Sequence, residues 1–322
     1  MRAWQVAALG EAPALAEIQP LVPGKGQALV RVMAAGLNFA DLLMAQGRYQ
    51  VRPALPFVPG MEFSGIVTAL GPGAEGPAPG TRVMGTCTGG ALADCICASA
   101  DRLIPLPDCV GDEEAAGFPI AYGTSHLALT RKAGLRPGET LFVTGAAGGV
   151  GLTAVEIGKR LGARVIASAR GAERLAVAAA AGADVLIDSE AEGLKDGLRG
   201  EGGVDVVYDT VGGPAFDAAL RACRPDGRLL AIGFASGEVP QVPANLLLVR
   251  NLAVIGFWYG GYQDHAPQVV ADSMAELLRW RAEGTLRPHV SQVLPFEALP
   301  EGLELLRTRR ATGKVVIRVQ QQ

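Results

Sequence analysis

The stretch Val143-Thr-Gly-Ala-Ala-Gly-Gly-Val-Gly-Leu152 decides the fold class, because it places a glycine-rich turn between an apolar strand and a helix. The apolar run "TLFV" leads into the turn, and "TAVEIGKRLG" follows it with apolar residues at helical spacing. A second apolar run, "ARVIASA", comes next. A strand, a glycine turn, a helix and a second strand in this order are typical of a βαβ unit that binds a dinucleotide.

Each glycine of the turn has a physical use in holding phosphates. Gly148 lets the backbone approach a pyrophosphate closely, and Gly151 lets the helix pack tightly on the strand. The unpaired N–H groups and partial positive charge of the helix start favour an anion. Ala146 stands where a glycine is usual, and its methyl group is tolerated if φ stays negative. The predicted cofactor-binding residues of this turn are Ala146, Ala147, Gly148, Gly149, Val150 and Gly151.

The end of the second strand predicts which dinucleotide is bound. Enzymes that use NAD usually have an acidic residue there, which holds the ribose hydroxyls. This strand ends in Ser168-Ala169 and is followed by Arg170 and Arg174. A hydroxyl and two guanidinium groups would bind a 2′-phosphate, so the sequence favours NADPH over NADH. The alternative is that both arginines are solvated side chains at a helix start, but positive charge in a first helical turn opposes the helix dipole.

The rest of the chain predicts two kinds of domain. Residues 1–120 are rich in glycine, proline and short β-type runs, which indicates a largely antiparallel β domain. Residues 121–262 alternate strand-like and helix-like segments, which indicates a parallel sheet with helices on both faces. Residues 263–322 read as a linking helix, a second helix and a strand that returns to the first domain. The predicted fold class is therefore α/β, with a β-rich domain beside a doubly wound parallel sheet.

Composition excludes several classes of protein. Of the 322 residues, 49% are hydrophobic and 19% charged, which argues against a disordered or fibrous chain. The net charge of −3 gives no reason to expect nucleic acid or an anionic membrane surface. No signal pattern or membrane-spanning run is present, so we expect a cytoplasmic protein. The five scattered cysteines do not form a disulfide framework, and the three histidines limit metal and triad chemistry.

Several motifs together resemble a known family. The motifs are "GLNFADLLMAQGRY", "PFVPGMEFSGIVTALG", "GTRVMG", "ADRLIPLPD", "AYGTSHLAL", "GAAGGVG", "VDVVYDTVGG" and "ATGKVVI". They resemble the zeta-crystallin-like quinone oxidoreductases of the medium-chain dehydrogenase/reductase superfamily, and "VPANLLLVRNLAVIGFWYGGYQ" resembles its quinone oxidoreductase-like branch. The resemblance implies a GroES-like catalytic domain, a Rossmann domain, and homodimers joined through the last Rossmann strand, near residues 251–257.

Departures from the superfamily's zinc enzymes are equally informative. Asn38 stands where those enzymes have a cysteine ligand, and Met61 stands where they have a histidine. Neither an amide nor a thioether there makes a catalytic zinc site. Cys87, Cys95, Cys97 and Cys109 also lack the tight spacing of the structural zinc lobe. We expect no metal, and we interpret Glu62 as a structural residue.

The resemblance also implies which residues surround the reacting groups. Asn38 and Thr124 are expected near the nicotinamide, with Tyr49 at the substrate; Tyr49 could equally cap a loop. The cofactor-binding residues implied after the Rossmann strands are Thr210, Gly233, Phe234, Ile255, Gly256 and Phe257. Trp258, Tyr259 and Tyr262 form an aromatic cluster for which packing is the favoured interpretation.

Three functions are compatible with these residues. The first is NADPH-dependent reduction of a quinone, where nicotinamide supplies a hydride and the protein orients the reactants. The second is reduction of an activated C=C bond, in an alkenal or enoyl thioester, which needs a placed proton donor. The third is a non-enzymatic NADPH-binding redox sensor. Because Tyr49 is the only visible proton donor, the sequence favours quinone reduction.

Overall fold

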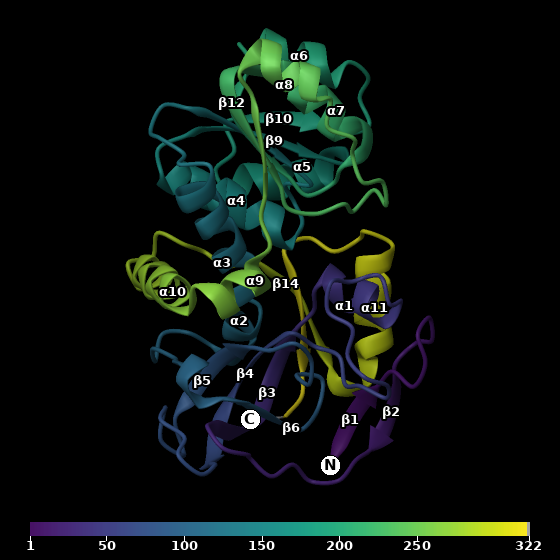
Figure 1. Cartoon of the computed structure of the whole chain (residues 1–322), viewed down its shortest axis with the longest axis vertical. Helices are drawn as coiled ribbons and strands as arrows, with labels where there is room; N and C mark the ends of the chain where they lie inside the picture. Colours follow the sequence, from purple (N-terminus) through teal and green to yellow (C-terminus); the bar gives the residue numbers. More distant parts are fainter. Residues whose placement is uncertain (321–322) are drawn as a thin grey trace. The chain divides into compact units, whose positions relative to one another are not determined.

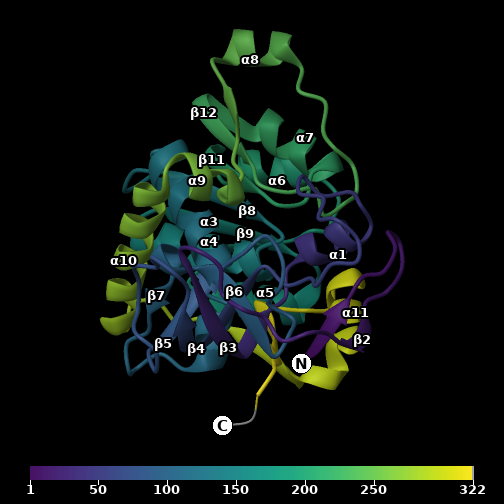
Figure 2. The same ribbon diagram turned by 60° about the horizontal axis from the view of Figure 1, so that its bottom comes forward.

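The computed structural model describes residues 1–320, and the chain divides into two compact units. Unit 1 combines Met1–Ile120 with the C-terminal segment that begins at Pro288. Unit 2 is the continuous segment Ala121–Arg287. Unit 1 is therefore built from both ends of the chain, and in Figures 1 and 2 its purple and yellow segments lie side by side.

Unit 1 is a β-rich domain with short helices. Its main sheet has the strand order β14-β15-β3-β4-β5-β7, with β6 also paired to β3, while β1 and β2 form a separate pair. Every pairing in the main sheet is antiparallel except the one between β14 and β15. Its strands are β1 (Arg2–Gln5), β2 (Ala14–Glu17), β3 (Gln27–Gly36), β4 (Glu62–Leu70), β5 (Arg82–Thr86), β6 (Cys95–Ser99), β7 (Ile104–Pro105), β14 (Val290–Pro295) and β15 (Lys314–Arg318). Its helices are α1 (Phe39–Ala45), η1 (Ala100–Arg102), α2 (Asp112–Ala116), η3 (Phe296–Ala298) and α11 (Leu299–Arg307).

The last strand completes the core of unit 1. In β15, Lys314 to Ile317 are all buried, and the strand pairs with β3 through registers such as Val316 to Gly36. Val315 and Ile317 join Phe63 and Phe296 in one apolar cluster. A terminal strand that is buried along its length needs a sheet to satisfy its backbone hydrogen bonds, so the chain end returns to the first domain.

A buried carboxylate connects α1 to the loop before β4. Asp41 is 2% exposed and accepts hydrogen bonds from the backbone N–H groups of Asn38 at 2.8 Å and Gly60 at 3.1 Å. Burial raises the pKa of Asp41 to about 6, although these N–H groups and the charge of Lys314 act in the opposite direction. Gly60 has a φ of +95°, which a side chain rarely adopts, so this contact depends on glycine.

Unit 2 is a parallel sheet flanked by helices. Its strand order is β10-β9-β8-β11-β12-β13, and every pairing is parallel. The strands are β8 (Thr140–Thr144), β9 (Arg164–Ala169), β10 (Val185–Asp188), β11 (Val204–Asp209), β12 (Cys223–Ala231) and β13 (Ala253–Gly256). The helices are α3 (Pro119–Leu127, which begins in unit 1), η2 (Ala128–Lys132), α4 (Gly149–Arg160), α5 (Gly171–Ala180), α6 (Leu194–Gly200), α7 (Gly213–Ala222), α8 (Ala244–Arg250), α9 (Tyr259–His265) and α10 (Pro267–Ala282).

Helices cover both faces of this sheet. All five residues of β8 are buried, and neighbouring residues of a strand point to opposite faces. Phe142 clusters with Phe216 of α7 and Leu198 of α6. On the other face, a Cβ added to Gly158 of α4 would meet Leu141 at 2.5 Å, so this glycine lets α4 lie close against the strand. Burial on both faces explains why the strands are continuous apolar runs in the sequence.

The predicted α/β class is confirmed, and most predicted elements are present. The run "TLFVTG" contains β8, "ARVIASA" contains β9, and the predicted helix near residues 268–283 is α10. The strand β14 and the short helices α8 and α9 were not anticipated, because β14 alternates weakly and each short helix has only seven residues. No helix within residues 1–320 combines the length and apolar character needed to cross a membrane.

The raised pKa of Asp41 predicts a pH-dependent stability. A carboxyl group whose pKa is higher in the folded state favours folding when it is protonated. The ionised Asp41 side chain therefore lowers the free energy of unfolding most above pH 6, and this loss disappears toward pH 4. Chemical denaturation at pH 7 and at pH 5 should show that the free energy of unfolding of wild type rises by about 1 kcal/mol relative to that of Asp41→Asn as the pH falls. The exposed Asp217→Asn variant is the control. Identical pH dependence in wild type and Asp41→Asn would contradict the assignment.

Candidate functional site: a dinucleotide cradle and a buried polar cluster

The glycine turn is shaped by close backbone contacts. Gly145 has a φ of +60°, whereas Ala146 keeps a negative φ and is fully buried. A Cβ on Gly151 would lie 2.2 Å from the Gly145 carbonyl oxygen, so no side chain fits there. Gly148 caps α4 without a side chain, which leaves the first N–H groups of the helix open to an anion. The cradle therefore fits a pyrophosphate, and Gly145 is a turn residue that the sequence analysis missed.

A hydrogen-bond network joins the carboxyl ends of β8 and β11. The Thr144 hydroxyl donates to Asp209 Oδ1 at 2.6 Å, and it accepts from the Thr210 N–H at 2.9 Å. The Thr210 hydroxyl donates to the Thr144 carbonyl at 2.9 Å, and the Gly212 N–H donates to Asp209 Oδ2 at 2.9 Å. Asp209 is completely buried, and this burial raises its pKa. Thr210 therefore lies against Gly145 of the glycine turn.

The other candidate residues of unit 2 follow neighbouring strands. The Gly233 N–H donates to the Asp209 carbonyl, and the Phe257 N–H donates to the Ala231 carbonyl at 3.2 Å. Phe234 is 38% exposed, and Ile255 and Gly256 are the last two residues of β13. The structure thus brings the glycine turn, Thr210 and Gly233 together at the carboxyl edge of the sheet. In open α/β sheets ligands bind at this edge, where the strand order reverses, here between β8 and β11.

The aromatic cluster after β13 is largely packed. Tyr259 and Tyr262 are 6% and 9% exposed, and the Tyr262 ring lies 5.2 Å from that of Phe257. Lys132 Nζ lies 5.5 Å from the centre of the Tyr262 ring. Only Trp258 is substantially exposed, at 43%. These contacts agree with the packing interpretation.

The end of β9 holds the predicted phosphate-recognition residues. Ser168 is 2% exposed, so its hydroxyl has little access from solvent, and its carbonyl accepts the Ala146 N–H. Arg170 caps α5 and forms an ion pair with Glu190, with 3.0 Å between Nε and Oε1. Arg174 lies one turn into α5. The arginines are the more accessible candidates, and Glu190 is an acidic neighbour that the sequence analysis did not identify.

Asn38 lies in a buried polar cluster of unit 1. Its side-chain Nδ2 donates to Glu62 Oε1 at 2.8 Å, and its Oδ1 accepts from Lys314 Nζ at 2.9 Å. Lys314 Nζ also contacts Glu62 Oε1 at 2.7 Å. Glu62 is 0% and Lys314 7% exposed. The sequence pattern indicates a structural role for Glu62 and contains no signal for Lys314, which lies 252 residues farther along the chain.

Thr124 and Tyr49 differ in their surroundings. Thr124 lies on α3 and is 7% exposed, and within residues 1–320 its side chain makes no hydrogen bond. Tyr49 is half-buried and packs on an apolar cluster that includes Met44, Phe57 and Met61. Met61 therefore takes part in packing. Within the described chain, no group of three or more histidine, cysteine, aspartate or glutamate side chains is arranged to hold a metal ion.

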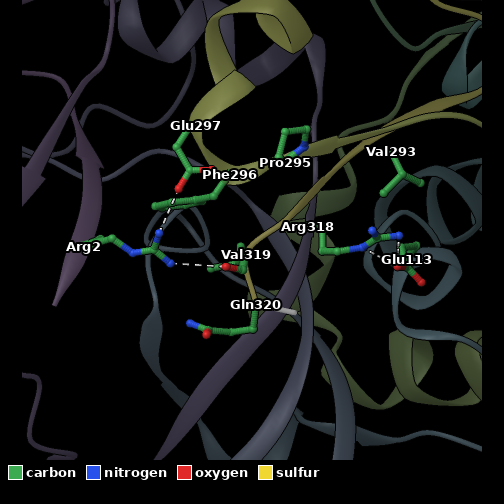
Figure 3. Close-up of a pocket in the computed structure, with 9 residues that line it drawn as sticks. All are labelled: Arg2, Glu113, Val293, Pro295, Phe296, Glu297, Arg318, Val319 and Gln320. Atoms are coloured by element: carbon green, nitrogen blue, oxygen red, sulfur yellow. Dashed lines mark hydrogen bonds and ion pairs between the residues drawn. The ribbon is translucent and has the colours of Figure 1, made fainter. Parts of the chain in front are cut away.

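A surface pocket of about 750 Å³ in unit 1 does not contain any candidate residue. Figure 3 shows Arg2 and Arg318 in its lining, together with Phe296. Arg2 pairs with Asp94 and Glu297, and Arg318 pairs with Glu113. These pairs neutralise both guanidinium groups, so the pocket presents no unbalanced charge to a ligand.

Comparisons with known proteins agree with this geometry. Residues 24–108 match the family "Alcohol dehydrogenase GroES-like domain", and residues 149–276 match "Zinc-binding dehydrogenase". The chain is 38% identical to a quinone oxidoreductase-like protein 2 homolog of Nematostella vectensis, over 92% of this chain and 83% of the other. It resembles the quinone oxidoreductase of Thermus thermophilus, solved also with NADPH, with a TM-score of 0.87 and 34% identity over 99% and 100% of the two chains. For the Escherichia coli quinone oxidoreductase complexed with NADPH, the TM-score is 0.92 and the sequence identity is 28%, and the match covers 99% of this chain and 100% of the other.

Both halves of the chain thus match the two domains of one enzyme superfamily, and the identity to the Nematostella protein spans nearly all of both chains. The chain therefore belongs to the quinone oxidoreductase-like members of the medium-chain dehydrogenase/reductase superfamily.

Proposed function

We propose that the protein reduces quinones with NADPH by hydride transfer and without a metal ion. The observation that carries this proposal is the glycine-rich start of α4 at the point where the strand order reverses, beside two arginines at the end of β9. Similarity to quinone oxidoreductases solved with NADPH supports it. Reduced nicotinamide supplies the hydride when it is bound.

The cofactor is bound by unit 2. The N–H groups at the start of α4 hold the pyrophosphate, and Thr210 and Gly233 lie at the same edge of the sheet. Arg170 and Arg174 hold the 2′-phosphate of NADPH. Arg170 must exchange its contact with Glu190 for the phosphate, and because that pair is exposed, breaking it costs little.

The first test concerns the choice of cofactor. Each arginine that binds the phosphate makes a contact worth about 1.5–3 kcal/mol, so Arg170→Ala with Arg174→Ala should weaken NADPH binding by at least ~100-fold. NADH has no 2′-phosphate, so its affinity should barely change. Glu190→Gln should strengthen NADPH binding alone, because it removes a competing negative charge. Fluorescence titration of both cofactors measures this, and a parallel loss of NADPH and NADH affinity would contradict it.

The residues proposed to contact the reacting groups are Asn38, Tyr49 and Thr124. Thr124 is 7% exposed on α3, and its hydroxyl forms no hydrogen bond within the described chain, so it is available to a ligand. Quinone reduction needs oriented reactants and stabilised charge on oxygen, whereas C=C reduction also needs a proton donor placed at carbon. The packing of Tyr49 in an apolar cluster does not favour such a donor.

A second test separates the candidate reactions. NADPH oxidation is measured with quinones, alkenals and enoyl thioesters in the presence of a metal chelator, and quinones should give the highest kcat/KM. Thr124→Ala should lower the single-turnover rate up to ~100-fold, since small misplacements of reactants are costly. Thr130→Ala, six residues further along the chain in η2, is the matched control. Turnover only with alkenals or thioesters, or loss of activity with chelator, would reject the proposal, and no turnover at all would favour a sensor.

We also propose a homodimer formed through β13. This strand is an edge of the sheet, paired only with β12. Apolar side chains are exposed in the segment before it, including Leu248 and Val249 of α8, at 78% and 74%. Figure 2 shows α8 at the end of the long connection between β12 and β13. An unpaired edge beside exposed apolar side chains fits a second copy of the same strand.

The dimer is tested by light scattering after size-exclusion chromatography. Wild type should have about twice the mass of one chain, and Leu248→Glu with Val249→Glu should shift it toward a monomer, because two charges would be buried at the interface. Exposed Thr68→Glu, in unit 1, is the control. A monomeric wild type, or a dimer unaffected by both glutamates, would contradict the proposal.

A further inference from the structure

The cluster around Asn38 is a closed set of charge-assisted contacts. Lys314 Nζ donates to three oxygens: the Leu37 carbonyl at 2.7 Å, Asn38 Oδ1 at 2.9 Å and Glu62 Oε1 at 2.7 Å. An ammonium group has three hydrogens, so all are used. Oε1 of Glu62 accepts hydrogen bonds from Lys314 Nζ and Asn38 Nδ2. Oε2 of Glu62 accepts a hydrogen bond from the Ile120 N–H at 2.9 Å. Each charge is therefore neutralised and hydrogen-bonded inside unit 1.

A glycine makes room for this cluster. A Cβ on Gly36 would lie 2.9 Å from Glu62 Oε1 and 2.3 Å from the Ala116 carbonyl oxygen. Gly36 ends β3, two residues before Asn38. The backbone can therefore pass close to the carboxylate, which in turn reaches the Asn38 amide.

These partners determine which way the Asn38 amide points. Lysine only donates hydrogen bonds and an ionised carboxylate only accepts them, so the amide atom facing Lys314 is oxygen and the one facing Glu62 is nitrogen. The inverted amide would place NH₂ against the ammonium and oxygen against the carboxylate. The second amide hydrogen is directed to the Gly36 carbonyl at 3.4 Å. Both N–H groups are thus committed within the protein, and only oxygen lone-pair density remains for a ligand.

We propose that Lys314, together with Glu62, is a positioning residue that makes Asn38 a hydrogen-bond acceptor toward the ligand. This inference rests on the proposed function, which puts Asn38 beside the reacting groups. The group that Asn38 recognises is then an N–H or O–H donor. Two sources have this chemistry: the carboxamide NH₂ of the nicotinamide and a hydroxyl of the hydroquinone product. Asn38 does not donate to the carbonyl oxygen of the quinone.

Two matched ligand pairs test the inference in wild type. The first pair is NADPH and its 3-acetylpyridine analogue, which has a methyl ketone in place of the carboxamide and so lacks N–H donors; their dissociation constants are measured by fluorescence without a quinone. The second pair is a hydroquinone and its dimethyl ether, measured as inhibitors. In at least one pair the donor-bearing member should bind about 2- to 10-fold tighter, as expected for one hydrogen bond. Which pair discriminates identifies the source of the donor.

Two variants then test the role of Lys314. Asn38→Ala should abolish the preference within that pair. Lys314→Met with Glu62→Gln removes both charges together, which avoids leaving a buried carboxylate unpaired, and it should abolish the preference to the same extent. Adding Asn38→Ala to this double variant should cause no further loss, because the three residues act through one contact. The control is Arg82→Met with Asp112→Asn, which removes another partly buried ion pair of unit 1 and should keep the preference. Thermal melts establish that each variant is folded.

Each result has a distinct meaning. A preference that depends on Asn38 but survives in the folded Lys314→Met, Glu62→Gln variant would overturn the role of Lys314. No preference in either ligand pair, with Asn38→Ala raising only the KM for quinone, would show that Asn38 donates and would overturn the acceptor assignment. If Asn38→Ala changes neither cofactor binding nor kinetics with any acceptor, the placement of Asn38 in the proposed function fails, and the inference fails with it.

Discussion

The ion pair between Lys314 and Glu62 is the interaction on which the arrangement of unit 1 depends. Glu62 begins β4 and Lys314 begins β15, so the pair joins the N-terminal and C-terminal parts of this unit at a site where both side chains are buried. Removing one partner would leave a buried charge, which typically costs 3–5 kcal/mol. The same pair holds the amide of Asn38. Stability of the β-rich unit and orientation of a proposed ligand-binding side chain thus have one physical origin.

In unit 2 the equivalent constraint is the close approach of backbone to backbone at the glycine turn. Gly145 and Gly151 have no room for side chains. Hydrogen bonds among Thr144, Asp209 and Thr210 join β8 to β11, the two strands at which the strand order reverses. The buried network keeps the ends of β8 and β11 in register, so that the N-terminus of α4 faces the edge of the sheet where ligands bind. Here a rigid scaffold presents backbone N–H groups, and no charged side chain is needed for the pyrophosphate.

The ion pair at the proposed phosphate site of unit 2 differs from the pair in unit 1 because it lies at the surface. The pair of Arg170 and Glu190 is solvent-exposed, so each partner exchanges readily for water or for a ligand. The pair of Lys314 and Glu62 cannot exchange in this way, because its donors and acceptors are all used inside the core. An exposed pair suits reversible binding of a phosphate, and a buried pair suits permanent orientation of a neighbour.

The sequence by itself determined the parallel sheet, the dinucleotide turn and the family, because apolar periodicity and the glycine spacing around Gly148 and Gly151 are local properties of the chain. It also predicted a C-terminal strand that needs a sheet to join, and in the structure β15 pairs with β3. It did not reveal that Lys314 meets Asn38 and Glu62, or that Glu190 pairs with Arg170. Those contacts join residues 20 to 276 positions apart, and no local pattern records them. Only the packing of strands against one another decided them, because a side chain's hydrogen-bond partners follow from where the backbone places it and not from its neighbours in the sequence.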